Sequence, residues 1–389
     1  MSLLKRAQGT AISGLILMVL IGSSIASALD QPKVERRELE LRPHMQLAYG
    51  ALVKVLAATA KESEVNNYKG MVETESALKV MADEAKIIHS IIMKGDKEHE
   101  FLSQELQKST ELAYNRYKGG FREQAKFHIS DVVSTCFGCH TSRNSAFDSQ
   151  FTSTFTKDVQ LDNFEPLAKA RFLSLSRQFE LSASEYESLF LSKGLSTDEL
   201  INLDPMVEYL ILTVRVKNDV NRALKTFTAL GKRNFPETVK RDIASWVAGL
   251  KSIQGQKPEK DKLAQSKNMI KMARGSMEYP RDRSGMVQYV LASKYLHEYV
   301  NEEGLSKERK AEVYYELGGC ENVLATQFSA DEANVYFSEA IRLAPKTDLA
   351  RKAFARYEEN VLYGYSGSSG VHLPEDEKLK LENLKKQAL

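Results

Sequence analysis

The sequence predicts an all-α protein. Glycine and proline, which interrupt helices, are sparse at 21 and 9 of 389 residues, and no stretch shows the alternation of β-branched residues that is typical of strands. Apolar residues instead recur at spacings of three and four, as Met45, Tyr49, Leu52 and Leu56 do. This spacing places them on one face of an amphipathic helix. A chain of this length is expected to form two or three domains, and we expect two.

The first domain, residues 29–150, is predicted to be an up-down four-helix bundle. Its helical stretches occupy 38–62, 66–94, 97–118 and 121–146. Only short breaks separate them, and short connections between long helices favour antiparallel neighbours. Between about 147 and 162 the sequence becomes rich in Ser, Thr, Asp and Phe without periodicity, which predicts the domain boundary.

The second domain, residues 163–365, is predicted to be a solenoid of paired helices. Shorter helical stretches occupy 164–178, 183–193, 205–216, 218–232, 236–252, 259–274, 284–302, 306–324, 330–343 and 347–362. In one pair, small and aromatic residues stand at Tyr314, Leu317, Gly318, Ala333, Phe337, Ala340 and Pro345. Their spacing resembles the tetratricopeptide repeat, whose small residues let paired helices approach and stack. The alternative is an irregular helical domain with one chance match.

Both ends of the chain differ from these domains. Residues 1–28 are predicted to be a secretory signal peptide, because Lys5 and Arg6 precede the apolar run 11–22 and small residues lead to cleavage after Ala28. We therefore expect an exported, periplasmic protein, anchored to a membrane only if the run 11–22 is not removed. Residues 366–389 are predicted to be a flexible linker and a charged tail with an exposed helix.

Composition excludes some classes of function. The chain is 42% apolar and 27% charged, which is ordinary for a folded soluble protein. Its net charge of +2 gives no reason to expect a nucleic acid as partner. No nucleophile with a matching base and no glycine-rich phosphate loop stands out. The sequence therefore predicts a protein that is not an enzyme.

One motif carries specific chemistry. Cys136, Cys139 and His140 form the pattern Cys-x-x-Cys-His, which is the attachment motif of c-type haem. Two thiols at this spacing can add to the vinyl groups of one haem, and the adjacent His is held beneath the iron as its proximal ligand. Three other interpretations compete, namely a structural disulfide, a thioredoxin-like redox pair and a zinc site. The redox pair needs a βαβ setting, and no second Cys or His pair completes a zinc site.

Bundle and motif together resemble the four-helix-bundle cytochromes c, the class of cytochrome c′ and its low-spin relatives. The resemblance covers residues 38–150 and implies one haem c at one end of the bundle, with the sixth position of the iron facing the first helix. In low-spin relatives a Met early in that helix fills this position, and Arg42 and Met45 stand near its start here. The resemblance also makes Arg143 a candidate contact of a haem propionate.

Bundle geometry alone also suggests candidates for the sixth ligand. In an up-down bundle, the end of the fourth helix shares one level with the start of the first, the end of the second and the start of the third. The Met and His residues at that level are Met45, His44, His89, Met93 and His99. Met45 is favoured because it shares the inward face of its helix, and His89 is the alternative. His128 is excluded, because twelve residues of helix place it about 18 Å from His140.

These features predict a monohaem cytochrome that transfers single electrons. We expect a redox partner protein at the haem edge and a second protein partner on the helical repeats. The alternatives are a five-coordinate haem that binds or senses gases, and a periplasmic scaffold with an accessory haem. Peroxidase-like activity stays open, since it needs only an open iron and a distal base. Cys320 is expected to be a small buried apolar residue.

Overall fold

The structure is a computed structural model of the chain. It describes residues 33–60, 68–94, 97–142, 161, 164–202, 204–257, 259–278, 282–325, 332–368 and 370–389. The predicted signal peptide, Arg143 and all but residue 161 of the predicted boundary at 147–162 lie outside these ranges.

The all-α prediction is confirmed. The described residues are almost entirely helical, and their one pair of strands is a short hairpin. In that hairpin β1 (Ser366–Gly367) and β2 (Gly370–Val371) pair antiparallel, with Ser366 opposite Val371.

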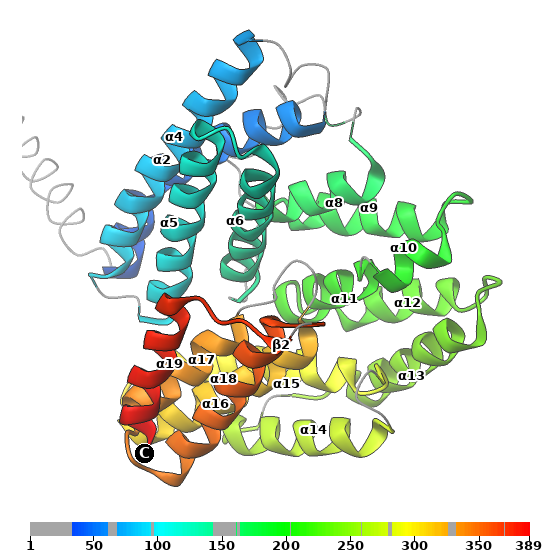
Figure 1. Ribbon diagram of the computed structural model, residues 1–389. Helices are drawn as coiled ribbons and strands as arrows, with labels where there is room; N and C mark the ends of the chain where they lie inside the picture. Colours follow the sequence, from blue (N-terminus) through cyan, green and yellow to red (C-terminus); the bar gives the residue numbers. More distant parts are fainter. Residues whose placement is uncertain are drawn as a thin grey trace, which may run out of the picture.

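The N-terminal helices are long and pack in sequence order. Their bounds are α2 Lys33–Ala60, α4 Tyr68–Ile92, α5 Lys97–Lys118 and α6 Arg122–Ser142. Helix α2 packs on α4, α4 on α5 and α5 on α6 (Figure 1). The apolar faces that the sequence predicts are buried, as at Leu52, Leu78 and Val132. These helices agree closely with the predicted ranges, because 3.6-residue periodicity over long stretches is a strong local signal.

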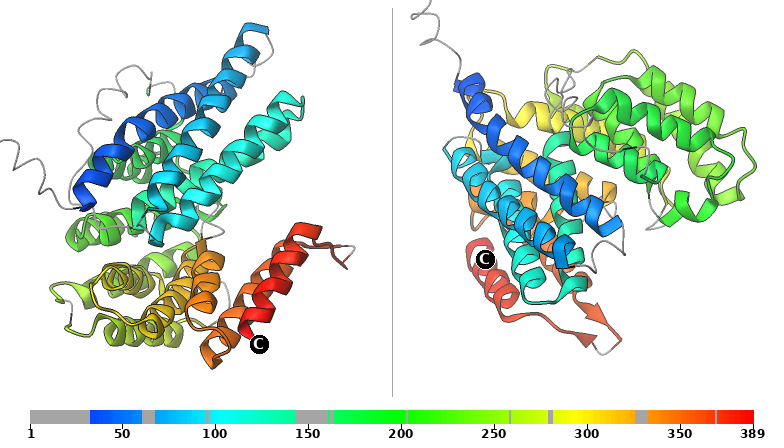
Figure 2. Two further views of the ribbon diagram at one scale, coloured as in Figure 1. Left: turned by 90° about the vertical axis from the view of Figure 1, so that its left-hand side faces the viewer. Right: turned by 90° about the horizontal axis from the view of Figure 1, so that it is seen from above.

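The later helices are shorter and form a stacked array. Their bounds are α8 Pro166–Leu175, α9 Phe179–Leu191, α10 Thr197–Asn202, α11 Pro205–Leu210, η2 Ile211–Val216, α12 Val220–Leu230, α13 Glu237–Ile253, α14 Lys262–Ser276, α15 Met286–Val300, α16 Lys307–Leu324, α17 Glu332–Leu343, α18 Asp348–Gly364 and α19 Glu375–Ala388. Most pack against the next helix in the chain, as α8 on α9, α12 on α13 and α14 on α15 do. Two further views show this array beside and beneath the long N-terminal helices (Figure 2).

The segment predicted as one helix at 205–216 changes its winding. It begins as α11 and continues as the π-helical turn η2. Such π turns are rare, and they re-aim side chains relative to a regular helix. In η2 the turn carries Arg215, whose side chain is only 2% exposed. Sequence periodicity does not reveal this change of winding.

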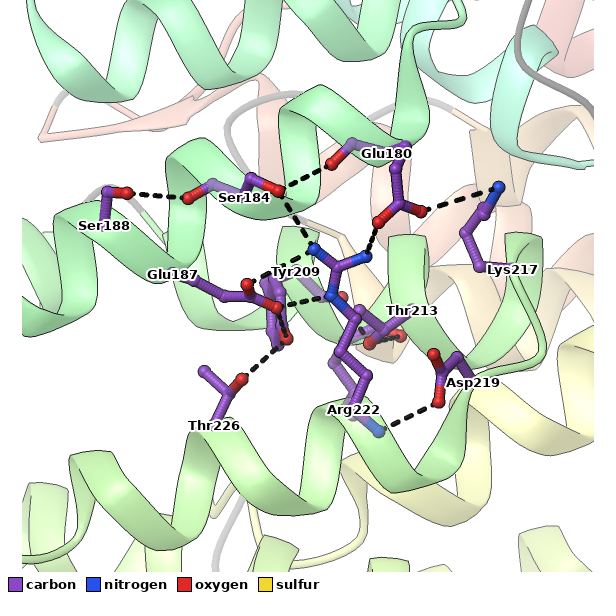
Figure 3. Close-up of polar contacts among 11 residues, drawn as sticks. Glu180, Ser184, Glu187, Ser188, Tyr209, Thr213, Lys217, Asp219, Arg222 and Thr226 are labelled. Atoms are coloured by element: carbon purple, nitrogen blue, oxygen red, sulfur yellow. Dashed lines mark hydrogen bonds and ion pairs between the residues drawn. The ribbon is translucent and has the colours of Figure 1, made fainter.

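Aromatic side chains fill the core of the second region. The ring of Phe227 lies 5.7 Å from Tyr209 and 5.2 Å from Trp246. A polar network at the edge of this core joins α9, α11 and α12 through Arg222 (Figure 3). Its guanidinium donates to both Glu187 and Glu180, and the Tyr209 hydroxyl donates to Glu187 over 2.7 Å.

The helix pair that resembles a repeat packs closely. A Cβ atom at Gly318 of α16 would lie 2.6 Å from the ring of Phe337 of α17, so only glycine fits this approach. Leu317, Ala333 and Ala340 are buried around it. The small side of α16 at Gly318 therefore lets these two helices approach closely.

The C-terminal tail differs from the exposed helix that the sequence predicts. Helix α19 packs on α17 and α18, with Leu381, Leu384 and Ala388 buried. The main-chain N–H of Lys346 also donates to the carbonyl of Gln387 over 3.0 Å. The apolar face of α19 consists of only three residues, and the many charged residues around them make it hard to recognise in the sequence.

Candidate functional site: a haem-attachment segment

The Cys-x-x-Cys-His motif lies in the last two turns of α6. Residues at i, i+3 and i+4 share one side of a helix, so Cys136, Cys139 and His140 lie together. All three are half-buried, and the cysteines are thiols rather than a disulfide. Burial raises the pKa of the Cys136 thiol to about 12. The segment therefore presents two thiols, of which that of Cys136 is protonated, and an imidazole side by side.

His140 is fixed by one hydrogen bond. Its Nδ1 donates to the main-chain carbonyl of Leu175, at the end of α8, over 2.8 Å. Because a carbonyl can only accept, Nδ1 must carry the proton and Nε2 keeps its lone pair. Histidines that bind metals commonly use this arrangement, since it fixes the ring and makes the other nitrogen a better ligand.

The charge state of His140 agrees with this tautomer. Burial lowers the pKa of the imidazole to about 4, and the positive charge of Arg177 acts in the same direction. The hydrogen bond to Leu175 opposes both effects without cancelling them. His140 is therefore neutral at physiological pH, which is the form that binds a metal.

One turn of α8 meets both the motif helix and the first helix. Leu175, which accepts from the motif histidine, lies in this turn. The ring of Phe172, earlier in the same turn, lies 5.4 Å from that of Tyr49 of α2. Met45 precedes Tyr49 by one turn and shares its side of α2. The motif side of α6 and the Met45 side of α2 thus face the same part of α8.

The histidine candidates for a sixth ligand hold the N-terminal helices together. His44 lies 2.7 Å from Glu84 of α4, His89 lies 2.8 Å from Ser103 of α5, and His99 of α5 lies 3.0 Å from Ser142 of α6. Met93 is exposed. His89 faces α5 through this contact, whereas Met45 lies on the helix side that meets α8.

The opposite side of α6 contacts a buried arginine. Arg215 of η2 donates through Nη2 to the hydroxyl of Thr141 over 3.2 Å. That hydroxyl donates in turn to the carbonyl of Phe137, inside the motif, over 2.8 Å. Nη1 of Arg215 donates to Glu321 of α16 over 2.7 Å and to Ser293 of α15 over 3.2 Å. A single guanidinium therefore joins the motif segment to three elements of the second region.

A buried carboxyl group touches the motif as well. A Cβ atom placed on Gly138 would lie 1.5 Å from Oε1 of Glu332, the first residue of α17. Only a glycine between the two cysteines allows this contact. Glu332 is 5% exposed, and no donor within the described residues hydrogen-bonds its Oε1.

The two carboxyl groups of this cluster, Glu321 and Glu332, have pKa values that are shifted in opposite directions. Burial alone would raise the pKa of Glu321, yet Arg215 and His297 hold it below its ordinary value. The pKa of Glu332 is raised to about 8, first by burial and then by the negative charge of Glu321. Glu321 is thus ionised and paired with Arg215, whereas the pKa of Glu332 lies close to physiological pH.

The residues present fit a covalently attached haem. The two thiols and the His lie on one helix side, and the imidazole has its Nε2 available as a ligand atom with Nδ1 anchored. Within the described ranges no group of three or more His, Cys, Asp or Glu could hold a bare metal ion. Haem needs no such group, because the porphyrin supplies the equatorial ligands of its iron.

Sequence reasoning did not find the cluster or the anchoring carbonyl. The carbonyl of Leu175 leaves no trace in a side-chain pattern. Arg215 and Glu208 did give a signal, since both interrupt the apolar run 206–216, and charged residues are buried only when they are paired. Glu208 is indeed fully buried and accepts from Arg171 over 2.7 Å.

No protein-family model, no curated protein and no solved structure matches this chain. No helix within the described ranges is long and apolar enough to cross a membrane. The function is therefore argued from the motif and its surroundings alone.

Proposed function

We propose that the protein is an exported monohaem c-type cytochrome that transfers single electrons. The observation that carries this proposal is the hydrogen bond from Nδ1 of His140 to the carbonyl of Leu175. It sets the histidine that follows Cys136 and Cys139 in the tautomer and orientation of an axial ligand. A disulfide or a thioredoxin-like pair would give no role to a neutral, anchored His at this position.

The chain's own residues would hold the haem and tune it. Cys136 and Cys139 would form its thioether bonds and Nε2 of His140 would bind its iron, which would supply the one-electron chemistry. The carbonyl of Leu175 holds the His140 ring in place for this role. The N-terminal helices α2, α4, α5 and α6 form the proposed four-helix bundle, and Arg143 remains the proposed propionate contact.

We propose Met45 as the sixth ligand, with His89 as the alternative. Support comes from α8, which contacts both the helix side of Met45 through Tyr49 and the motif through Leu175. A Met opposite His raises the reduction potential of a haem and closes its iron to gases. If the sixth position is instead open, the protein binds or senses a gas.

The helical array from α8 onward is proposed to be a tetratricopeptide-like solenoid that docks a protein partner. The close packing of α16 on α17 at Gly318 supports a repeat-like pair. Because Arg215 and Glu332 of this array contact the motif segment, a partner bound on the array would be connected to the haem segment through these contacts.

The decisive experiment expresses the full chain, with its leader, in bacteria that carry the haem-attachment machinery. We expect the denatured protein to keep its haem, and the pyridine haemochrome spectrum to show one c-type haem per chain. The C136A/C139A double variant should lose it, while Cys320→Ala, which removes the third thiol, should retain it. Wild-type protein without covalent haem would contradict the proposal.

The sixth ligand is tested by the absorption spectrum of the ferric protein. We expect the weak red band typical of Met ligation. Met45→Ala should abolish this band and give a high-spin spectrum, whereas Met93→Ala, at an exposed Met of the same bundle level, should keep it. A band that survives Met45→Ala but disappears in His89→Ala would reassign the ligand.

A further inference from the structure

The cluster beside the haem-attachment segment contains a buried carboxyl group, that of Glu332, with one oxygen that no hydrogen-bond donor of the described residues reaches. Glu332 is 5% exposed, and its Oε1 lies against Gly138, between the two cysteines. Within the described residues no hydrogen-bond donor reaches this oxygen. A buried carboxylate that accepts no hydrogen bond is unfavourable, so it neutralises unless a positive charge compensates it.

The nearest positive charge is already engaged elsewhere. The guanidinium of Arg215 donates to Glu321 over 2.7 Å, and also to Ser293 and Thr141. Glu332 therefore faces an ion pair whose charge is balanced. We infer that Glu332 binds a proton more tightly when the haem holds the added electron, so that reduction is accompanied by partial proton uptake at Glu332 and oxidation by its release.

This inference rests on the proposed function. An external one-electron donor, such as a reduced cytochrome, is oxidised by one electron as the iron passes from ferric to ferrous. The added negative charge makes the ionised carboxylate of Glu332 less stable, because burial leaves little water to screen the two charges. A proton from solvent then forms an O–H bond with the carboxylate.

The charged and titratable groups that act on Glu332 come from three other elements. Glu321 of α16 raises the pKa of Glu332, whereas Arg215 of η2 and His297 of α15 oppose it. Helix α6 adds no charge to the cluster. Glu332 contacts its main chain at Gly138, and the α6 side chain in the cluster is the uncharged Thr141. Burial is the largest influence and sets the pKa at about 8, so the group can change charge within the physiological range.

Gly138 is the structural requirement for this coupling. It is the only residue type whose lack of a Cβ lets the carboxyl group reach the backbone between the cysteines, because any Cβ would overlap Oε1. The titrating group is thereby held in non-bonded contact with the backbone between the two haem attachment points. A carboxylate on the outer surface of α17 would be screened by water and would respond weakly.

The test measures the reduction potential of the holoprotein against pH. For wild type we expect the potential to fall as pH rises through about 8, because the ionised carboxylate disfavours the added electron. If reduction strengthens proton binding on the order of tenfold, the total fall is about 59 mV. Glu332→Gln, which is neutral at every pH, should keep the high potential across this range.

The matched control is Glu339→Gln, on the same helix. Glu339 pairs with Arg342 at the edge of the array, so this variant should titrate like wild type. A wild-type potential that does not change near pH 8, or a Glu332→Gln profile identical to that of wild type, would overturn the inference.

A second measurement needs no variant. Reduction of wild-type protein in weak buffer near pH 8, followed with an indicator dye, should take up a fraction of one proton per electron, and no uptake would overturn the inference. Haem content of the same samples, from the pyridine haemochrome spectrum, separates the two proposals. A sample that carries covalent haem but takes up no proton contradicts only this inference, whereas a sample without covalent haem contradicts the proposed function.

Discussion

The regions on either side of residue 150 build their interiors from different side chains. Before it, the buried residues are mostly small or aliphatic, such as Ala51, Leu78 and Ala113. After it, the core contains large aromatic residues, among them Tyr186, Phe227 and Trp246. In the first region the largest fully buried side chain is Phe137, which lies within the motif. The second region therefore buries large rings in its core, whereas the long helices of the first region pack through smaller side chains.

The contact between the regions has a buried polar part beside its apolar one. Arg215 and Glu332 reach from the second region to the motif, and the Arg215–Glu321 pair is 2% exposed on both sides. Such pairs add little net stability compared with apolar residues, but breaking one leaves an uncompensated buried charge. The contact therefore specifies how the two regions fit together.

Arg215→Met should have the largest effect on stability. It leaves Glu321 buried without its guanidinium partner and removes the donor to Thr141, at a cost of about 3–5 kcal/mol in the free energy of unfolding. Urea unfolding followed by far-UV circular dichroism measures this loss. We also expect fluorescence of Trp246, the only Trp, to report a different midpoint from haem absorbance, because the regions no longer unfold together.

The control for this variant is Arg351→Met. Arg351 pairs with Asp348 on the outside of α18, where both side chains are exposed, so the cost should stay below about 1 kcal/mol. Equal losses for the two variants would show that the buried pair does not join the regions.

The next largest effect separates the two cores. Phe227→Ala removes a ring that contacts Tyr209 and Trp246, and should cost about 3–5 kcal/mol. Leu52→Ala, in the first region, should cost about 2–3 kcal/mol, because a smaller side chain is lost. Both are measured by urea unfolding at constant pH. A larger loss for Leu52→Ala would mean that the first region, not the aromatic core, dominates stability.

The sequence predicted the local features of the molecule well and its long-range contacts poorly. The bounds of most helices follow from periodicity within a few residues. The contact of His140 with Leu175 joins residues 35 positions apart, and that of Gly138 with Glu332 crosses both regions. Neither leaves a local pattern. The motif can be recognised because its chemistry lies in five consecutive residues, 136–140. Its surroundings cannot, because they come from residues that are distant in the sequence.

The smallest predicted effect is the change in stability with pH that Glu332 causes at the polar contact between the regions. The folded-state pKa of Glu332, about 8, exceeds its ordinary value of 4.5. The folded protein therefore holds this proton more tightly than the unfolded chain does, and the resulting stability is full below pH 4.5 and is lost as pH rises through about 8. Glu332→Gln cannot ionise, so its stability relative to wild type should increase over this interval.

We expect a relative gain on the order of 1–2 kcal/mol between about pH 6 and pH 7, where each unit of pH within the interval between the two pKa values corresponds to about 1.4 kcal/mol. Measuring wild type and variant side by side cancels the titration of every other group, including Glu208, whose pKa is also raised by burial. A difference that is constant with pH would mean that Glu332 finds a compensating donor in solution. Glu332 would then not change its protonation state in this pH range, and it could not be the group that binds a proton when the haem is reduced.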